Sequence, residues 1–206
     1  MEIYDNENEQ VDAIKRFFAE NGKALAVGVV LGIGALLGWR YWNSHQSESA
    51  RTTSLVYDKA ISAISAEKPA TLEAVDKFVD ENQNNYGALA ALNLARQYVD
   101  TQALDKAAAT LQKGVTATKD SQLQALLNLR LARVLVQQKQ ADAALKTLET
   151  IKGEGWTAMV ADMRGEALLS KGDKQGAREA WSQGVNSGAS PALREMMQMK
   201  INNLSS

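Results

Sequence analysis

Residues 24–42 read ALAVGVVLGIGALLGWRYW, and this stretch separates two parts of the chain that differ in character. Its first 16 residues carry no charge. A helix of these 19 residues is about 28 Å long, close to the ~30 Å hydrocarbon core of a bilayer. Arg40 can reach the lipid headgroups, and Trp39, Tyr41 and Trp42 suit the interface beside it. The stretch therefore predicts a single N-terminal transmembrane helix.

Two other interpretations of this apolar stretch stay open. It can be a core helix of a soluble protein, although 16 consecutive uncharged residues are long for one. It can also be a secretory signal peptide, because Ser47 and Ser49 before Ala50 resemble a cleavage site. The preceding 23 residues contain six acidic groups, however, whereas a signal peptide has a short basic leader. An uncleaved anchor is favoured.

Basic residues on either side of the stretch indicate its orientation. Lys15, Arg16 and Lys23 precede it, and Arg40 and Arg51 follow it closely. This excess favours an N-terminus on the cytoplasmic side, although three against two is too small a margin to fix the topology alone.

Residues 1–23 are then expected to form a cytoplasmic tail. A short amphipathic helix is predicted over residues 9–20, ending at Asn21 and Gly22. It can lie along the membrane interface, and a weakly ordered tail is the alternative. Its apolar side consists of Val11, Ile14, Phe17 and Phe18.

Four glycines in the apolar stretch predict contacts with another helix. Gly28 and Gly32 are four residues apart, as are Gly34 and Gly38, and this spacing lets membrane helices approach closely. The partner is either another membrane protein or a second copy of the chain. Because glycine is common in membrane helices, the spacing is also compatible with no packing role.

The composition disfavours several classes of function. The chain has a net charge of −1; the tail has six acidic and three basic residues, hence −3, so the rest carries +2. A nucleic-acid-binding protein needs a concentrated basic face instead. The chain has no cysteine, and His45 is its one histidine, so we expect no metal site and no cofactor. Gly153, Gly155 and Ala158 have a dinucleotide-type spacing, but they follow a predicted helix and indicate a helix break. Without a catalytic constellation, we expect a protein that is not an enzyme.

The sequence from residue 44 onwards is typical of an all-α domain. It is rich in Ala, Leu, Gln and Lys and has only two prolines. Ser121 with Gln124 predicts a capping box, and Ser190 with Pro191 predicts a helix start. Helices are predicted over residues 44–66, 69–82, 86–99, 103–114, 121–138, 141–152, 157–171, 174–186 and 191–204.

These helices repeat as pairs. A small residue precedes an alanine by 12 positions three times, at Ala95 and Ala107, at Ala132 and Ala144, and at Gly165 and Ala177. Successive units are offset by 37 and then 33 residues, which are periods of helical solenoids. The pairs are predicted at 44–82, 86–114, 121–152 and 157–186, with a capping helix at 191–204. A simple helical bundle is the alternative.

The repeat resembles the tetratricopeptide family. The similarity is strongest over residues 157–186, in Gly165, Ala177, Trp181 and the sequence KGD at 171–173. The first two units lack the early tryptophan and the closing proline of the family. The resemblance implies an inner face built from the first helix of each pair, able to bind an extended peptide or a helix. An ordinary core with a solvated charged face is the alternative. The inward positions would be Leu92, Arg96, Val99, Leu129, Arg133, Val136, Asp162, Glu166 and Leu169.

The whole chain also resembles the YfgM family, ancillary subunits of the bacterial SecYEG translocon. The similarity is carried by residues 1–46, by QADAALKTLETIKGEGW at 140–156 and by MQMKINNL at 197–204. It implies a type II protein of the inner membrane whose repeat domain, residues 44–206, is periplasmic. The implied partners are the translocon, the chaperone PpiD, periplasmic chaperones and exported client proteins, and the tail is implied to contact the Rcs response regulator. The alternative function is a general assembly factor or adaptor for envelope complexes.

Overall fold

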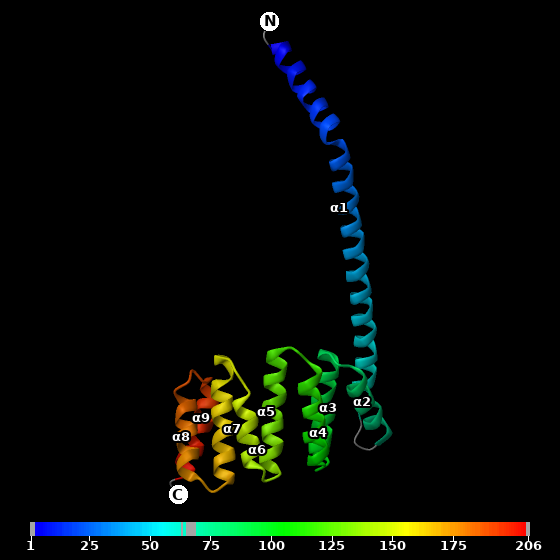
Figure 1. The fold of residues 1–206 in the computed structure, drawn as a ribbon. Coiled ribbons are helices and arrows are strands. Elements are labelled where there is room, and N and C mark those ends of the chain that lie inside the picture. The colour runs from blue at the N-terminus through cyan, green and yellow to red at the C-terminus, as the bar shows by residue number, and fades with distance from the viewer. Residues whose placement is uncertain (1–2, 63, 65–68, 205–206) are drawn as a thin grey trace. The chain divides into compact units, whose positions relative to one another are not determined.

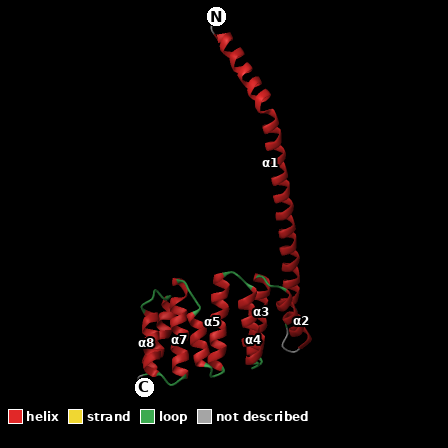
Figure 2. Ribbon diagram, viewed as in Figure 1, coloured by secondary structure: helices red, strands yellow, loops and turns green. Residues whose placement is uncertain are grey.

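The computed structural model describes residues 3–62, 64 and 69–204, with side chains except at residues 3–10, 13, 45–51 and 69. Within these residues the structure contains α-helices and one short 3-10 helix but no strand (Figure 2). The predicted all-α class is therefore confirmed. The chain divides into two compact units, Met1–Thr53 and Ser54–Ser206.

Helix α1 runs from Ile3 to Ser62 (Figure 1). Its segment Ile14–Ser44 is long and apolar enough to cross a membrane, and none of the most apolar window is buried within the protein. The predicted end at Asn21 and Gly22 is wrong, because the helix continues through both residues. Glycine weakens a helix by only about 1 kcal/mol, and Asn21 Nδ2 donates a hydrogen bond to the Phe17 carbonyl at 3.1 Å, within the helix.

A separate helix beginning at residue 44 is also not observed. The apolar segment and the first helix predicted after it form one continuous helix, α1, as far as Ser62. No proline or helix-ending glycine stands between residues 39 and 62, so nothing in the sequence interrupts the backbone hydrogen bonds. Residues 63, 65 and 66 of the predicted helix lie outside the described residues.

The other predicted helices are confirmed, with ends shifted by a few residues. Consecutive helices pack as pairs, α3 with α4, α5 with α6 and α7 with α8, and each pair packs against the next. The elements are α2 (Pro69–Glu81), α3 (Asn85–Asp100), α4 (Leu104–Ala117), α5 (Ser121–Gln137), α6 (Ala141–Glu149), η1 (Glu154–Trp156), α7 (Thr157–Ser170), α8 (Lys174–Val185) and α9 (Pro191–Asn203).

Two predicted helix starts have different outcomes. Ser190 caps α9 and accepts a hydrogen bond from the Leu193 amide at 3.4 Å, as predicted. The capping box at Ser121 is wrong, because Asp120 is the N-cap residue of α5, and its carboxylate accepts hydrogen bonds from two backbone amides. Aspartate is a strong N-cap and stands one residue earlier. The side chain of Gln124 instead donates to the Thr118 carbonyl at 2.8 Å.

The small residues allow the close packing that their spacing predicted. Ala107, Ala144 and Ala177 are fully buried. A Cβ atom on Gly165 of α7 would lie 2.3 Å from Nε1 of Trp181 on α8, well inside van der Waals contact. The same Nε1 donates a hydrogen bond to the backbone carbonyl of Asp162 at 3.0 Å. The third pair is therefore closed by an indole ring packed on a glycine.

Polar side chains connect each pair to the next at the repeat period. The Gln138 amide binds the Asp105 carboxylate at 2.6 Å and the Trp156 indole binds Gln122 at 2.8 Å, over separations of 33 and 34 residues. The bond of Lys171 to Asp142 joins the places that correspond, one unit later, to Gln138 and Asp105, which is expected of a stacked repeat. Further bonds of this kind, over 36 to 38 residues, join Asn93 to Tyr57, Lys113 to Asp76 and Lys200 to Asp162.

The last helix is attached by a charged cluster. Lys200 Nζ on α9 lies 2.6 Å from the Asp162 carboxylate and 2.6 Å from that of Glu166, both on α7, and Asp162 is almost completely buried. Burial lowers the pKa of Lys200, but the hydrogen bonds and charges of the two carboxylates raise it more, so the net pKa is above the ordinary 10.5. A lysine whose pKa is higher in the folded than in the unfolded state stabilises the fold. This stabilisation is complete at pH values below the unfolded-state pKa and is lost as the pH rises through the folded-state pKa.

Replacing Gly165 by alanine should destabilise the repeat domain. The new methyl group would overlap the Trp181 ring, and overpacking of this kind costs about 1–3 kcal/mol. Urea unfolding of the detergent-solubilised full chain, followed by tryptophan fluorescence, measures the effect. Gly155→Ala is the matched control, because no atom lies within 4 Å of the Cβ position there. Equal unfolding midpoints for the two variants would contradict this packing.

Lys200→Met should destabilise the domain at neutral pH, because it leaves the buried Asp162 carboxylate unpaired. We expect roughly 2 kcal/mol, below the 3–5 kcal/mol of fully buried pairs, since the Lys200 side chain is 24% exposed. The difference from the unchanged protein should persist at mildly alkaline pH and shrink only above about pH 10.5. Chemical unfolding at several pH values measures it, with exposed Lys119→Met as the control. A variant as stable as this control at pH 7 would refute the role of Lys200.

Candidate functional site

A hollow of about 400 Å³ lies between α3, α4 and α5. Its floor is aliphatic, and we call it the arginine groove, because three arginines also line it. The aliphatic residues are Leu92, Val99, Leu111, Leu126 and Val134, and the arginines are Arg96, Arg130 and Arg133. An apolar floor with a few charged groups is the usual composition of a site for a peptide or small ligand.

The arginines have little electrostatic compensation. Arg96 Nε lies 4.0 Å from the carboxylate of Asp100 on the same helix, and both side chains are mostly exposed. Such exposed pairs contribute little free energy. Among the described residues, Arg130 and Arg133 form no ion pair. An anionic group placed in the groove would therefore find guanidinium donors that are not already bound to carboxylates.

The predicted inward residues lie in three different environments. Leu92, Arg96, Val99 and Arg133 line the arginine groove. Leu129 and Val136, also on α5, are partly buried against the apolar cluster that α5 shares with α6 and α7.

The two carboxylates among the predicted inward residues, Asp162 and Glu166, are bound by another part of the chain. Their partner is Lys200 of α9, and of the three predicted inward residues of α7 only Leu169 is exposed. The expectation of one continuous groove from α3 to α7 therefore divides into an open part and a covered part.

Sequence reasoning did not identify Arg130. The repeat geometry assigns three inward positions to each first helix, and Arg133 is the charged one of the three in α5. Residues three apart share a helix face, so the pair Arg130 and Arg133 was the available signal.

The four glycines of the apolar stretch are open to their surroundings. No atom lies within 4 Å of the Cβ position at Gly28, Gly32, Gly34 or Gly38. At about 100° per residue, the first two and the last two form separate stripes about 120° apart on α1. Gly28 also lines a shallow hollow with Phe17 and neighbouring residues of the same helix. Each stripe is free for contact with another helix.

The structure also describes the residues considered for metal binding and for dinucleotide binding. Among the described residues, no group of three or more His, Cys, Asp or Glu side chains could hold a metal ion, and the side chain of His45 lies outside the described ones. The dinucleotide-type spacing is a helix break, as predicted, because Gly153 lies between α6 and η1 with a φ of 105°. This backbone conformation favours glycine without any ligand.

Comparison with known proteins shows the family to which the chain belongs. A family profile described as "Tetratricopeptide repeat-like domain" matches residues 15–206. The chain is 70% identical to the ancillary SecYEG translocon subunit of Escherichia coli K12 over 205 residues, all of both chains. It is 35% identical to the protein of that name from Haemophilus influenzae, covering 96% of this chain and 97% of that one. No solved structure gives a significant match. The chain therefore belongs to the family of ancillary SecYEG translocon subunits, and it carries a tetratricopeptide repeat-like domain.

Proposed function

We propose that this protein is a membrane-anchored, non-enzymatic scaffold that associates with the SecYEG translocon and helps pass exported proteins to periplasmic chaperones. The observation that carries the proposal is the 70% identity, over the whole chain, with a relative named for the translocon. The apolar segment of α1 fits an inner-membrane protein. A repeat domain with an open groove suits binding rather than catalysis.

The proposal gives each part of the chain a role. Residues 24–42 cross the inner membrane, residues 1–23 face the cytoplasm and the repeat domain lies in the periplasm, in agreement with the excess of basic residues before the apolar stretch. The chaperone PpiD is a proposed neighbour in the membrane. The tail is proposed to contact the Rcs response regulator.

The arginine groove is the proposed site for segments of exported chains. Its aliphatic floor favours apolar side chains, and Arg130 and Arg133 favour a carboxylate beside them. The preferred segment is therefore short, with an aliphatic residue next to an acidic residue or next to a chain end. Weak, exposed contacts of this kind suit a protein that must release its client.

Purification of the full chain in mild detergent tests the association with the translocon. We expect SecYEG to be recovered with it. Two double variants test whether a glycine stripe makes the contact: Gly28→Leu with Gly32→Leu, and Gly34→Leu with Gly38→Leu. The variant whose stripe makes the contact should lower the recovery of SecYEG, because leucine keeps the helices apart. The other variant then serves as the control. Undiminished recovery with both pairs would refute packing through the glycines, and no recovery with the unchanged chain would refute the association.

Charge reversal tests the groove. In membranes, a photo-crosslinker at Val99 should capture newly exported chains, and Arg130→Glu with Arg133→Glu should reduce this capture about tenfold, on the order of 1.4 kcal/mol. Reversal of two lysines outside the groove, Lys119→Glu with Lys174→Glu, is the control. Capture of a few fixed proteins instead of many clients would favour a general assembly factor for envelope complexes. Equal capture by both charge-reversed variants would refute client binding through the arginines.

A further inference from the structure

The N-terminal part of α1 has a second apolar surface, before the stretch predicted to cross the membrane. Val11, Ile14, Phe17 and Phe18 are 48–60% exposed. At about 100° per residue, these four side chains lie within one sector of the helix, about 120° wide. We call this sector the tail face. No other described element covers it.

The charged residues of the segment 11–23 lie outside this sector. They are three cations and two carboxylates, of which Lys15 and Asp12 form a loose ion pair at 3.4 Å. Within residues 11–23 this set is Asp12, Lys15, Arg16, Glu20 and Lys23, and the acidic residues Glu2, Asp5, Glu7 and Glu9 precede it. Residues 11–23 thus have a polar side with one more cation than carboxylates and an apolar side with two phenylalanines. An apolar face with aromatic residues opposite a charged face is the pattern of helices that lie in a membrane interface.

If α1 continued straight out of the membrane along its normal, part of the tail face would be exposed to water. Residues 24–42 already match the bilayer core. In a straight helix along the membrane normal, Phe18 would lie about 9 Å and Val11 about 20 Å beyond Ala24. The outer half of the tail face would then be exposed to water, although a membrane surface capable of covering it lies within about 20 Å.

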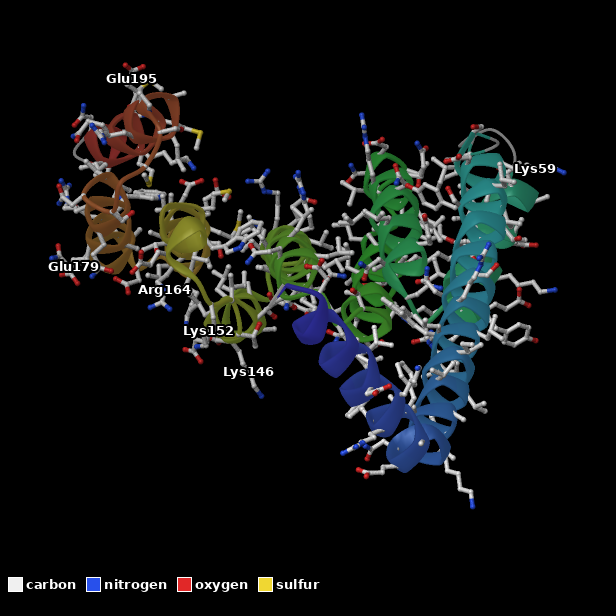
Figure 3. All side chains as sticks on the ribbon, turned by 90° about the horizontal axis from the view of Figure 1, so that it is seen from above. Lys59, Lys146, Lys152, Arg164, Glu179 and Glu195 are labelled. Carbon is white, nitrogen blue, oxygen red and sulfur yellow. The ribbon has the colours of Figure 1, made fainter. Side chains whose placement is uncertain are left out.

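The helix has a bend in this region. The blue N-terminal part of α1 leans away from the axis of the part that follows it (Figures 1 and 3). Asn21 and Gly22 give a physical cause for a bend, because Gly22 has no neighbour within 4 Å and the Asn21 side chain donates to the Phe17 carbonyl. A glycine and a side chain bonded to the helix backbone are both known sources of bending.

We propose that residues 11–20 lie along the surface of an anionic bilayer, with the tail face in the boundary between headgroups and acyl chains. Lys15, Arg16 and Lys23 then face lipid phosphates, and Asn21 and Gly22 provide the joint to the transmembrane segment. This inference rests on the proposed membrane anchoring. It holds whichever side of the membrane the tail occupies.

The absence of cysteine makes a direct test straightforward. Single substitutions Val11→Cys, Ile14→Cys and Phe18→Cys place a spin label on the tail face, and Ala19→Cys and Glu20→Cys place one on the opposite side. The full chain is reconstituted alone in vesicles of phosphatidylcholine with phosphatidylglycerol. Accessibility to oxygen, which concentrates in lipid, and to a water-soluble nickel chelate is then compared at each position.

The proposal predicts an accessibility that alternates with the helical period. The oxygen-to-nickel ratio should be several-fold higher on the tail face than at residues 19 and 20, and this contrast should weaken without phosphatidylglycerol. Uniform exposure to water from residue 11 to residue 18 would overturn the proposal. A steady rise from residue 11 to residue 20 would also overturn it, because it indicates a straight helix entering the bilayer.

Two controls separate the possible causes of failure. A label at Leu31→Cys reports the membrane anchor, so exposure of this position to water would refute the proposed anchoring itself. The same scan in native membranes detects a protein partner on the tail face. Alternation there, but not in vesicles of lipid alone, would show that a protein rather than the bilayer covers the face, and would overturn the proposal.

Discussion

The repeat domain depends on how closely the two helices of a pair can approach each other. Gly165 leaves the space in which the Trp181 ring lies, and the ring nitrogen in turn binds the backbone carbonyl of Asp162. The same constraint extends to the next helix, because Met197 of α9 fills the space beside Gly184 of α8. One pair cannot bury its own apolar face, so each pair contributes to the stability of its neighbours.

The spacing of small residues predicted the paired helices because close packing depends on local, periodic choices of residue. The unbroken course of α1 could not be predicted as easily, since Asn21 and Gly22 weaken a helix by amounts that the surrounding turns overcome. The capping box at Ser121 failed for a related reason, because two caps one residue apart compete and the stronger one, Asp120, sets the boundary. Contacts between side chains of neighbouring units, such as that of Lys200 with Glu166, depend on the exact alignment of two helices. The spacing of residues in the sequence gives that alignment only approximately.

Helix α9, the last helix that the structure describes, packs on α8 and corresponds to the first helix of a further repeat. Lys200 lies 34 residues after Glu166, so it occupies the equivalent position one unit later. On the other side of α9, where a second helix would pack in a complete unit, Glu195 and Asn202 are exposed, and Met199 stands where the other units have a small residue. A bulky residue and a polar surface there disfavour a further helix and keep the end of the stack soluble.

The inner face differs at its two ends because neighbouring units supply different charges. At the α7 end, the carboxylates of Asp162 and Glu166 find their counter-charge in Lys200, whose ammonium group also lies 5.7 Å from the centre of the Trp181 ring. At the α3 end, the charged positions of adjacent first helices carry the same sign, Arg96 and Arg133, so neither can neutralise the other. The attraction between opposite charges therefore closes one end within the chain itself. At the other end, Arg96 has only the exposed Asp100 as its partner, and Arg130 and Arg133 form no ion pair among the described residues, so the guanidinium groups of the arginine groove are left open to an external anion.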